Sequence, residues 1–140
     1  MLARIICALT LSAAFMPAQA EVTPIDAISG TWVTEGYGAV VRINPCTDDR
    51  ARVCGELVWI WDENDLVPAR NADPMLVNFR YENGAWRGGR LASPVSSRVY
   101  RGTITQRNAD TLDLMGCAAR VFCADQTWRR LESLPHVTAE

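Results

Sequence analysis

The stretch that decides the fold is residues 39–61, AVVRINPCTDDRARVCGELVWIW, in which two apolar runs flank a polar loop. Side chains alternate in the first run, where Val41 falls on one side and Arg42 on the other. A period of two is typical of a β-strand with one buried face. Cys46 and Cys54 bracket the loop, so the stretch predicts a hairpin clasped by a disulfide.

The same alternation recurs along the chain in both directions from this hairpin. No stretch holds a helical period for more than one turn, and we expect one helical turn at 24–29, as a lid or plug. Turn-forming residues separate the runs, as at 35–38, 82–84 and 108–110. We predict strands at 30–35, 39–44, 55–61, 75–81, 85–91, 98–106, 111–116 and 126–132. Eight sequential strands favour an all-β fold, a small antiparallel up-and-down barrel, because closure removes free sheet edges.

Parity along the strands assigns the faces of the barrel. The consistent alternate positions predict this core: Trp32, Val41, Ile43, Leu57, Trp59, Tyr100, Ile104, Leu112, Leu114 and Trp128. The charged side chains at Arg42, Arg101, Asp113 and Arg129 fall opposite them. Val58 and Ile60 make the other face of their strand apolar too, and with Trp61 they form either an outward contact surface or simple edge packing.

Four cysteines follow residue 20, and an even number in a small exported domain predicts two disulfides with three possible pairings. We favour Cys46 with Cys54 and Cys117 with Cys123, because each pair brackets a short loop between strand-like segments. Two loops separated by an odd number of strand reversals lie at opposite ends of a barrel, so the two disulfides should clasp opposite rims. Zinc is disfavoured, because neither spacing is that of a metal-binding cysteine pair.

Residues 1–20 are typical of a cleavable export signal. Arg4 gives the positive start, 5–15 the apolar run, and Ala18-Gln19-Ala20 the small-residue cleavage site. The apolar run is about half the roughly 20 residues that cross a bilayer, so we expect no transmembrane segment in the mature form. The sequence therefore predicts a single domain over 21–140 in the periplasm or outside the cell.

The charge balance of the mature chain argues against nucleic acid as a partner. Beyond residue 20 there are 13 arginines, no lysine and 16 acidic residues. Nucleic-acid-binding domains usually carry a net basic footprint, and this chain is mildly acidic.

Gly30-Thr31-Trp32 resembles the Gly-x-Trp signature of lipocalins and related calycin barrels. In those barrels the tryptophan closes one end and an arginine of the last strand packs across it. Arg130 matches that arginine, since it lies two residues beyond Trp128 and therefore on the same face. The resemblance implies a cation over the indole of Trp32, a contact worth about 0.5 to 2 kcal/mol.

A fuller pattern resembles the exported bacterial family called domain of unknown function 2147, over nearly all of the mature chain. Its elements are Gly30-x-Trp32, Pro45-Cys46, Cys54-Gly55-Glu56-Leu57-Val58-Trp59, Asn71-Ala72-Asp73-Pro74, Trp86-x-Gly88-Gly89, Pro94, Tyr100, Gly116-Cys117, Phe122-Cys123 and Gln126-Thr127-Trp128. The resemblance implies a lipocalin-like barrel with two local disulfides in a Gram-negative envelope, and it brings no verified activity.

No pattern for enzyme chemistry stands out, and we expect neither a catalytic site nor a cofactor or metal. The acidic run 62–65 lacks the glycine and spaced final carboxylate of a calcium loop. A carboxylate pair for acid and base chemistry needs an apolar hollow that raises one pKa. Glu35 and Glu56 are the carboxylates nearest to apolar strand segments, and we interpret both as ordinary residues of the barrel rim. The lone His136 lies in a polar tail, and without it the usual nucleophile and base pairs are missing.

Two binding hypotheses remain. In the first, the barrel takes a small apolar ligand in a shallow pocket at one mouth, because large inward side chains leave little interior space. The candidate pocket residues are Trp32, Trp59, Tyr100, Trp128 and Arg130. In the second, the barrel is a rigid scaffold whose rim loops contact or inhibit an envelope protein, with 62–74 as the natural contact segment.

Overall fold

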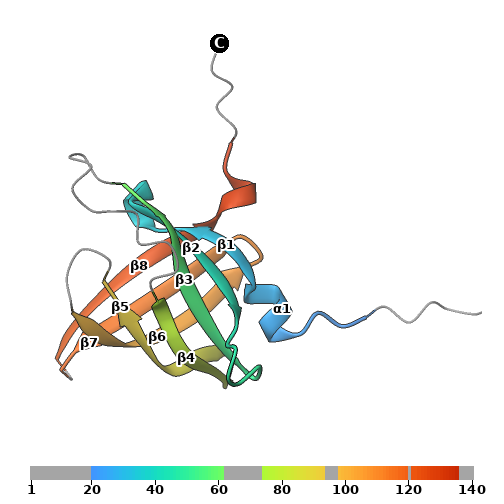
Figure 1. The fold of residues 1–140 in the computed structure, drawn as a ribbon, viewed down its shortest axis with the longest axis horizontal. Helices are drawn as coiled ribbons and strands as arrows, with labels where there is room; N and C mark the ends of the chain where they lie inside the picture. The colour runs from blue at the N-terminus through green and yellow to red at the C-terminus, as the bar shows by residue number, and fades with distance from the viewer. Residues whose placement is uncertain (1–19, 62–73, 94–97, 120, 136–140) are drawn as a thin grey trace, which may run out of the picture.

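The eight strands close into one antiparallel barrel in chain order, so each strand pairs with its neighbours in sequence and β1 pairs with β8 (Figure 1). The computed structural model describes residues 20–61, 74–93, 98–119 and 121–135. The strands are β1 (Gly30–Val33), β2 (Ala39–Pro45), β3 (Arg52–Ile60), β4 (Pro74–Glu82), β5 (Ala85–Ala92), β6 (Val99–Asn108), β7 (Thr111–Ala118) and β8 (Phe122–Arg130). The predicted fold class is confirmed.

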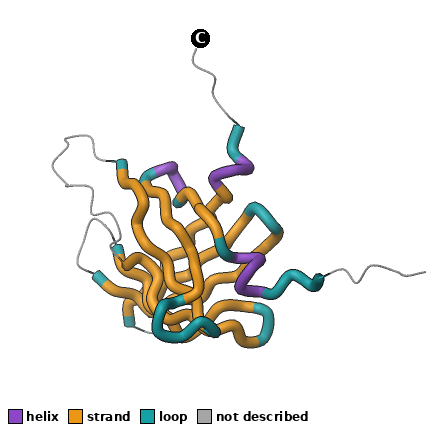
Figure 2. Tube along the Cα trace, turned by 45° about the vertical axis from the view of Figure 1, so that its right-hand side comes forward, coloured by secondary structure: helices purple, strands orange, loops and turns teal. Residues whose placement is uncertain are grey.

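Within these described ranges, three short helical segments accompany the strands, and Figure 2 shows them at the edge of the barrel. They are α1 (Pro24–Ile28), η1 (Glu35–Tyr37) and η2 (Leu131–Ser133). Thr23 caps α1 by accepting a hydrogen bond from the Asp26 amide, and a proline opens the helix. The helical turn expected at 24–29 is therefore present.

Turn chemistry sets the ends of the hairpins. Asn83 and Gly84 both have positive φ, 50° and 79°, as the tight turn between β4 and β5 requires. The Asn108 side chain accepts a hydrogen bond from the Asp110 amide and so holds the turn between β6 and β7. Thr34 ends β1 two residues earlier than predicted, because its hydroxyl accepts from the Ala39 amide at 2.9 Å and closes the next turn.

Both predicted disulfides are present, Cys46–Cys54 and Cys117–Cys123. The first lies at the β2–β3 turn and the second at the β7–β8 turn, with an odd number of strand reversals between them. They therefore clasp opposite ends of the barrel, as expected. The β8 strand starts four residues earlier than predicted, because the ladder continues through the pair Cys117 and Cys123 to Ala118 and Phe122.

A β-bulge in β3 overturns the predicted face of Trp59. Val40 pairs with Trp59 but Val41 pairs with Leu57, which leaves Val58 as an extra residue. One extra residue reverses the alternation beyond it. Leu57 is therefore buried, whereas Trp59 points outward and is 44% exposed. Assigning Trp59 to the core was wrong.

Because of the same bulge, the outward surface considered at Val58, Ile60 and Trp61 has a different composition from the predicted one. Ile60 turns inward and packs against the core, while the outward positions belong to Trp59 and Trp61, whose rings meet edge to face with centroids 6.2 Å apart. The other predicted core residues, Tyr100 apart, are buried. Tyr100 is half-buried because it faces an open hollow.

Residues 1–19, 62–73 and 136–140 lie outside the described part of the chain. The predicted export signal, the acidic run at 62–65, nearly all of the proposed contact segment and His136 fall there. In the ranges that the structure describes, no helix is long and apolar enough to cross a membrane.

Candidate ligand-binding cavity

One end of the barrel is sealed by Arg130, which joins β8 to the segment around α1. Its guanidinium lies 4.2 Å from the ring centroid of Trp32. The same group donates hydrogen bonds to the carbonyl oxygens of Ala27 and Ser29 at 2.8 and 2.9 Å, and to that of Ala109 at 2.8 Å. Hydrogen bonds from a charged donor are stronger than neutral ones, so this arginine fixes α1 across the end of the barrel.

The glycine of the Gly-x-Trp signature belongs to the same seal. Gly30 has φ 131°, and a Cβ there would lie 2.5 Å from Nη1 of Arg130. Trp32 is fully buried, and its indole N–H donates to the Ile28 carbonyl at 2.9 Å. The role that the resemblance implied for Arg130 is therefore seen in the structure.

Above the seal, the closed half of the barrel is densely packed. Phe79 occupies the centre, and added Cβ atoms at Gly89 and Gly102 would come within 2.3 and 2.8 Å of its ring. Trp86 and Ile104 are also fully buried in this half. The predicted crowding of the interior is correct for this half of the barrel.

The other half contains a cavity of about 990 Å³ that opens at the end of the barrel where β1, β3, β5 and β7 finish, and we call this end the mouth. The small side chain of Ala124 faces this space from β8, whereas Leu91 and Tyr100 cover Gly116, its partner in the β7–β8 ladder. The interior is therefore less filled than the tryptophan count suggested. The prediction placed any pocket at one mouth, and the cavity lies there.

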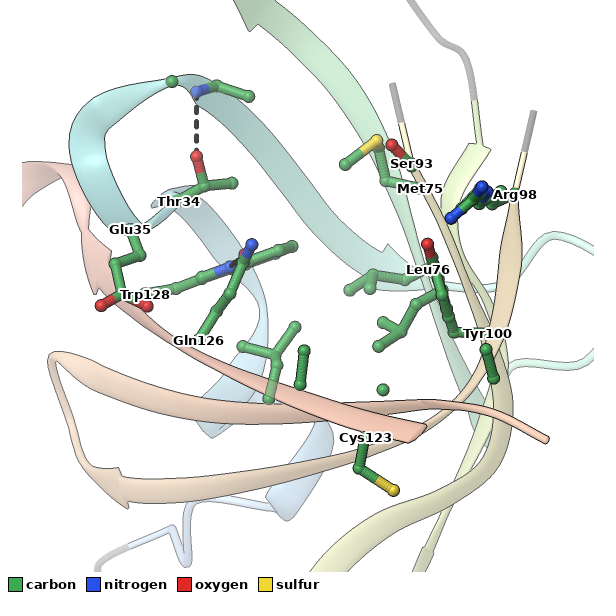
Figure 3. Close-up of a pocket in the computed structure, with 18 of the residues that line it drawn as sticks. Thr34, Glu35, Met75, Leu76, Ser93, Arg98, Tyr100, Cys123, Gln126 and Trp128 are labelled. Atoms are coloured by element: carbon green, nitrogen blue, oxygen red, sulfur yellow. Dashed lines mark hydrogen bonds between the residues drawn. The ribbon is translucent and has the colours of Figure 1, made fainter. Parts of the chain in front are cut away.

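Apolar side chains make up most of the cavity wall. They come from six strands and are Ala39, Ile60, Met75, Leu76, Leu91, Leu114 and Trp128. Figure 3 shows Trp128 and Gln126 on one side, facing Leu76 and Tyr100 on the other. The cavity thus offers mainly van der Waals contact to whatever enters it.

Polar groups gather nearer the opening. Thr34, Glu35 and Gln126 lie on one side, with Ser93 and Arg98 across the cavity (Figure 3). Gln126 accepts a hydrogen bond from the Trp128 indole at 2.9 Å, and Glu35 accepts one from the Thr127 amide at 3.2 Å. In the described ranges, every buried side-chain nitrogen or oxygen has a hydrogen-bond partner.

The structure divides the five candidate pocket residues into three groups. Tyr100 and Trp128 line the cavity. Trp32 and Arg130 lie together at the sealed end and do not line it. Trp59 lies on the outer surface because of the bulge.

Sequence reasoning considered Trp61 only for an outward contact surface or edge packing, whereas Trp61 also lines the mouth, although it is 62% exposed. It also missed Ala124, which lines the cavity but lies before the start of the predicted last strand at 126.

The two carboxylates considered for acid and base chemistry are not brought together. Glu35 lies at the mouth, whereas Glu56 lies on the outer wall with Arg42 at 3.5 Å. The part of the chain that the structure describes also holds no group of three or more histidine, cysteine, aspartate or glutamate side chains that could bind a metal.

An eight-stranded antiparallel barrel, sealed by a tryptophan and arginine at one end and hollow at the other, is a barrel of the lipocalin type. Protein HP1028 from the human pathogen Helicobacter pylori, which belongs to the lipocalin family, has a similar fold with a TM-score of 0.58. The two chains are 15% identical, and the match covers 76% of this chain and 84% of that one. The likeness concerns the fold.

The chain belongs to the family described as uncharacterized protein conserved in bacteria (DUF2147), whose model matches residues 30–130. The match spans the barrel from the start of β1 to the end of β8. Among curated proteins, no sequence matches the chain.

Proposed function

We propose that this protein is an exported, non-enzymatic binding module that holds a small apolar ligand in the cavity at the open mouth of its barrel. The asymmetry of the barrel carries the proposal: one end is sealed around Trp32 and Arg130, and the other is a mostly apolar hollow of about 990 Å³. Ligand sites in proteins occupy roughly 300 to 1,000 Å³ and are lined mainly by apolar side chains.

Within this proposal, Tyr100 and Trp128 contact the ligand, and Trp32 with Arg130 keeps the opposite end closed. The apolar depth favours a hydrocarbon or ring system. The polar rim of Ser93, Arg98 and Gln126 favours a ligand whose polar end stays at the opening, because burying that end unpaired would cost free energy. The proposal assigns Trp59 no contact.

Native mass spectrometry of protein recovered from its own compartment tests this directly. We expect an adduct of a few hundred daltons. Ala124→Trp places a large side chain in the cavity and should abolish the adduct, whereas Thr105→Trp, on the outward face of β6, should retain it. Equal adduct in the two variants, with both proteins folded, would contradict a ligand in this cavity.

The mouth favours a second candidate, an inhibitor or interaction module that contacts an envelope protein through its rim. Large apolar side chains around the opening are unusually exposed, with Tyr37 at 65%, Phe122 at 75% and Val121 at 80%. If the rim is the site, a protein of defined mass co-purifies and Val121→Ser with Phe122→Ser releases it. A small adduct that survives this double change favours the first candidate.

The proposed compartment is the periplasm or the exterior, with residues 1–20 as a cleaved signal and 21–140 as the mature domain. Two disulfides are typical of an exported protein, because oxidising compartments preserve them. Sequencing the amino terminus of the recovered protein should give Glu21 as the first residue.

A further inference from the structure

The positive charge of this acidic chain is concentrated in one stretch. Residues 85–108 contain five arginines and no acidic residue. The whole chain has a net charge of −2, so the remaining residues together carry −7. This stretch forms β5, β6 and their connection, which are adjacent in the barrel.

The strand register places arginines directly opposite one another on the outer wall. Arg90 of β5 pairs with Arg101 of β6, and Arg87 of β5 pairs with Arg80 of β4. Opposed residues of an antiparallel pair share a face, with Cβ atoms roughly 5 Å apart, and like charges there are destabilising. Their side chains face outward, because the neighbouring Gly89 packs against Phe79 in the core.

Elsewhere on the outer surface of the barrel, arginines lie beside carboxylates that neutralise them. Arg42 lies 3.5 Å from Glu56, and Arg107 makes two hydrogen bonds to Asp113. By contrast, none of the described acidic side chains lies within 4.0 Å of an Arg87, Arg90 or Arg101 nitrogen.

Exposed apolar side chains accompany these arginines. Val99 lies two residues before Arg101 on the same face of β6 and is 57% exposed. Met115 of β7 lies on the outer face between Thr103 of β6, which is beside Arg101, and Asp125 of β8, and is 48% exposed. The wall therefore combines clustered guanidinium groups with apolar side chains that water surrounds.

We propose that this surface, Arg87, Arg90 and Arg101 with Val99 and Met115, is an arginine wall that docks onto a lipid bilayer with anionic headgroups. Guanidinium groups pair with phosphate through two parallel hydrogen bonds. Apolar side chains beside them enter the boundary between headgroups and acyl chains, a property of membrane-surface elements. A soluble polyanion matches the charge of the wall but offers nothing to Val99 and Met115.

Vesicle binding by the mature, disulfide-bonded protein tests the proposal without reference to the cavity ligand. We expect co-sedimentation with phosphatidylcholine vesicles that contain phosphatidylglycerol, and much weaker binding to pure phosphatidylcholine. Binding should fall as salt rises, because mobile ions screen the attraction. Each arginine near an anionic surface strengthens binding roughly fivefold, so the triple change R87Q/R90Q/R101Q should weaken it by about 100-fold.

A charge-matched control separates the wall from net charge. The double change R42Q/R129Q removes arginines from β2 and β8, away from the wall, and should weaken binding less than about tenfold. The double change R90Q/R101Q removes one opposed pair and should weaken binding more than this control. The melting temperature of the triple variant should match or exceed that of the parent, because repulsion between opposed arginines is relieved.

Three results would overturn the proposal. The first is absence of binding to the anionic vesicles. The second is equal loss in the R90Q/R101Q and R42Q/R129Q variants. The third is a protein that does not bind the vesicles but binds tripolyphosphate, or self-associates through the arginine wall. Any of these outcomes leaves the cavity proposal standing, because that proposal is measured by the adduct.

Discussion

The two ends of this barrel use similar side chains in opposite ways. At the sealed end, Trp32 is fully buried and held between α1 and Arg130. At the open end, Trp61 is mostly exposed at the edge of the cavity. The sealed end stabilises the fold and the open end leaves space, so the stabilising contacts and the proposed binding site are separated along the barrel axis. Changes at the two ends should therefore have different consequences.

The largest expected effect comes from truncating the seal. Trp32→Ala should lower the free energy of unfolding by about 3 to 5 kcal/mol, because it removes a buried indole and the ring beneath a cation. Denaturant unfolding measures this. The matched change Trp61→Ala at the open end should cost less than about 1 kcal/mol. Similar losses in the two variants would remove the distinction between the ends.

The two disulfides offer a comparison of intermediate size. They enclose similar short loops, with sequence separations of 8 and 6, so chain entropy gives each about 2 to 2.5 kcal/mol. Cys46 is almost fully buried at the sealed end, whereas Cys123 is exposed at the mouth. Replacing Cys46 and Cys54 by alanine should therefore cost more stability than replacing Cys117 and Cys123. The reverse order in thermal unfolding would contradict this account.

The smallest expected effect concerns the outer surface. Trp59→Ala should change the free energy of unfolding by less than about 1 kcal/mol and leave ligand retention unchanged, because the side chain points away from the cavity. Tyr100→Ala, at the cavity wall, should reduce the adduct seen by native mass spectrometry. Loss of the adduct on changing Trp59 alone would place the ligand elsewhere.

Most of the barrel could be predicted from local sequence. Alternation located all eight strands, and short polar or small-residue loops between strand-like segments identified both disulfides. The turn at Asn83 and Gly84 followed from residues that tolerate positive φ. These features succeed because they depend on residues close to one another in the chain.

The candidate site was predicted only in part. Two of its five residues, Tyr100 and Trp128, line the cavity, and Trp59 was misplaced by the bulge at Val58. Alternation of apolar and polar residues cannot reveal a bulge, because nothing in the sequence marks which residue is the extra one. Every side chain beyond that residue then lies on the opposite face. The arginine wall was missed for a related reason, since the pairing of Arg90 with Arg101 depends on register between strands.

The sequence by itself determined the alternation of the strands and the two hairpins that carry disulfides. It also determined the residues Gly30, Trp32 and Arg130 that close one end of the barrel. Only the tertiary structure decided which half of the barrel is filled and which is hollow. That outcome depends on which inward side chains meet across the barrel, where Phe79 fills the space beside Gly89 and Gly102 while the small side chain of Ala124 lies exposed in the cavity. Packing of this kind arises between residues distant in the chain, and local patterns do not encode it.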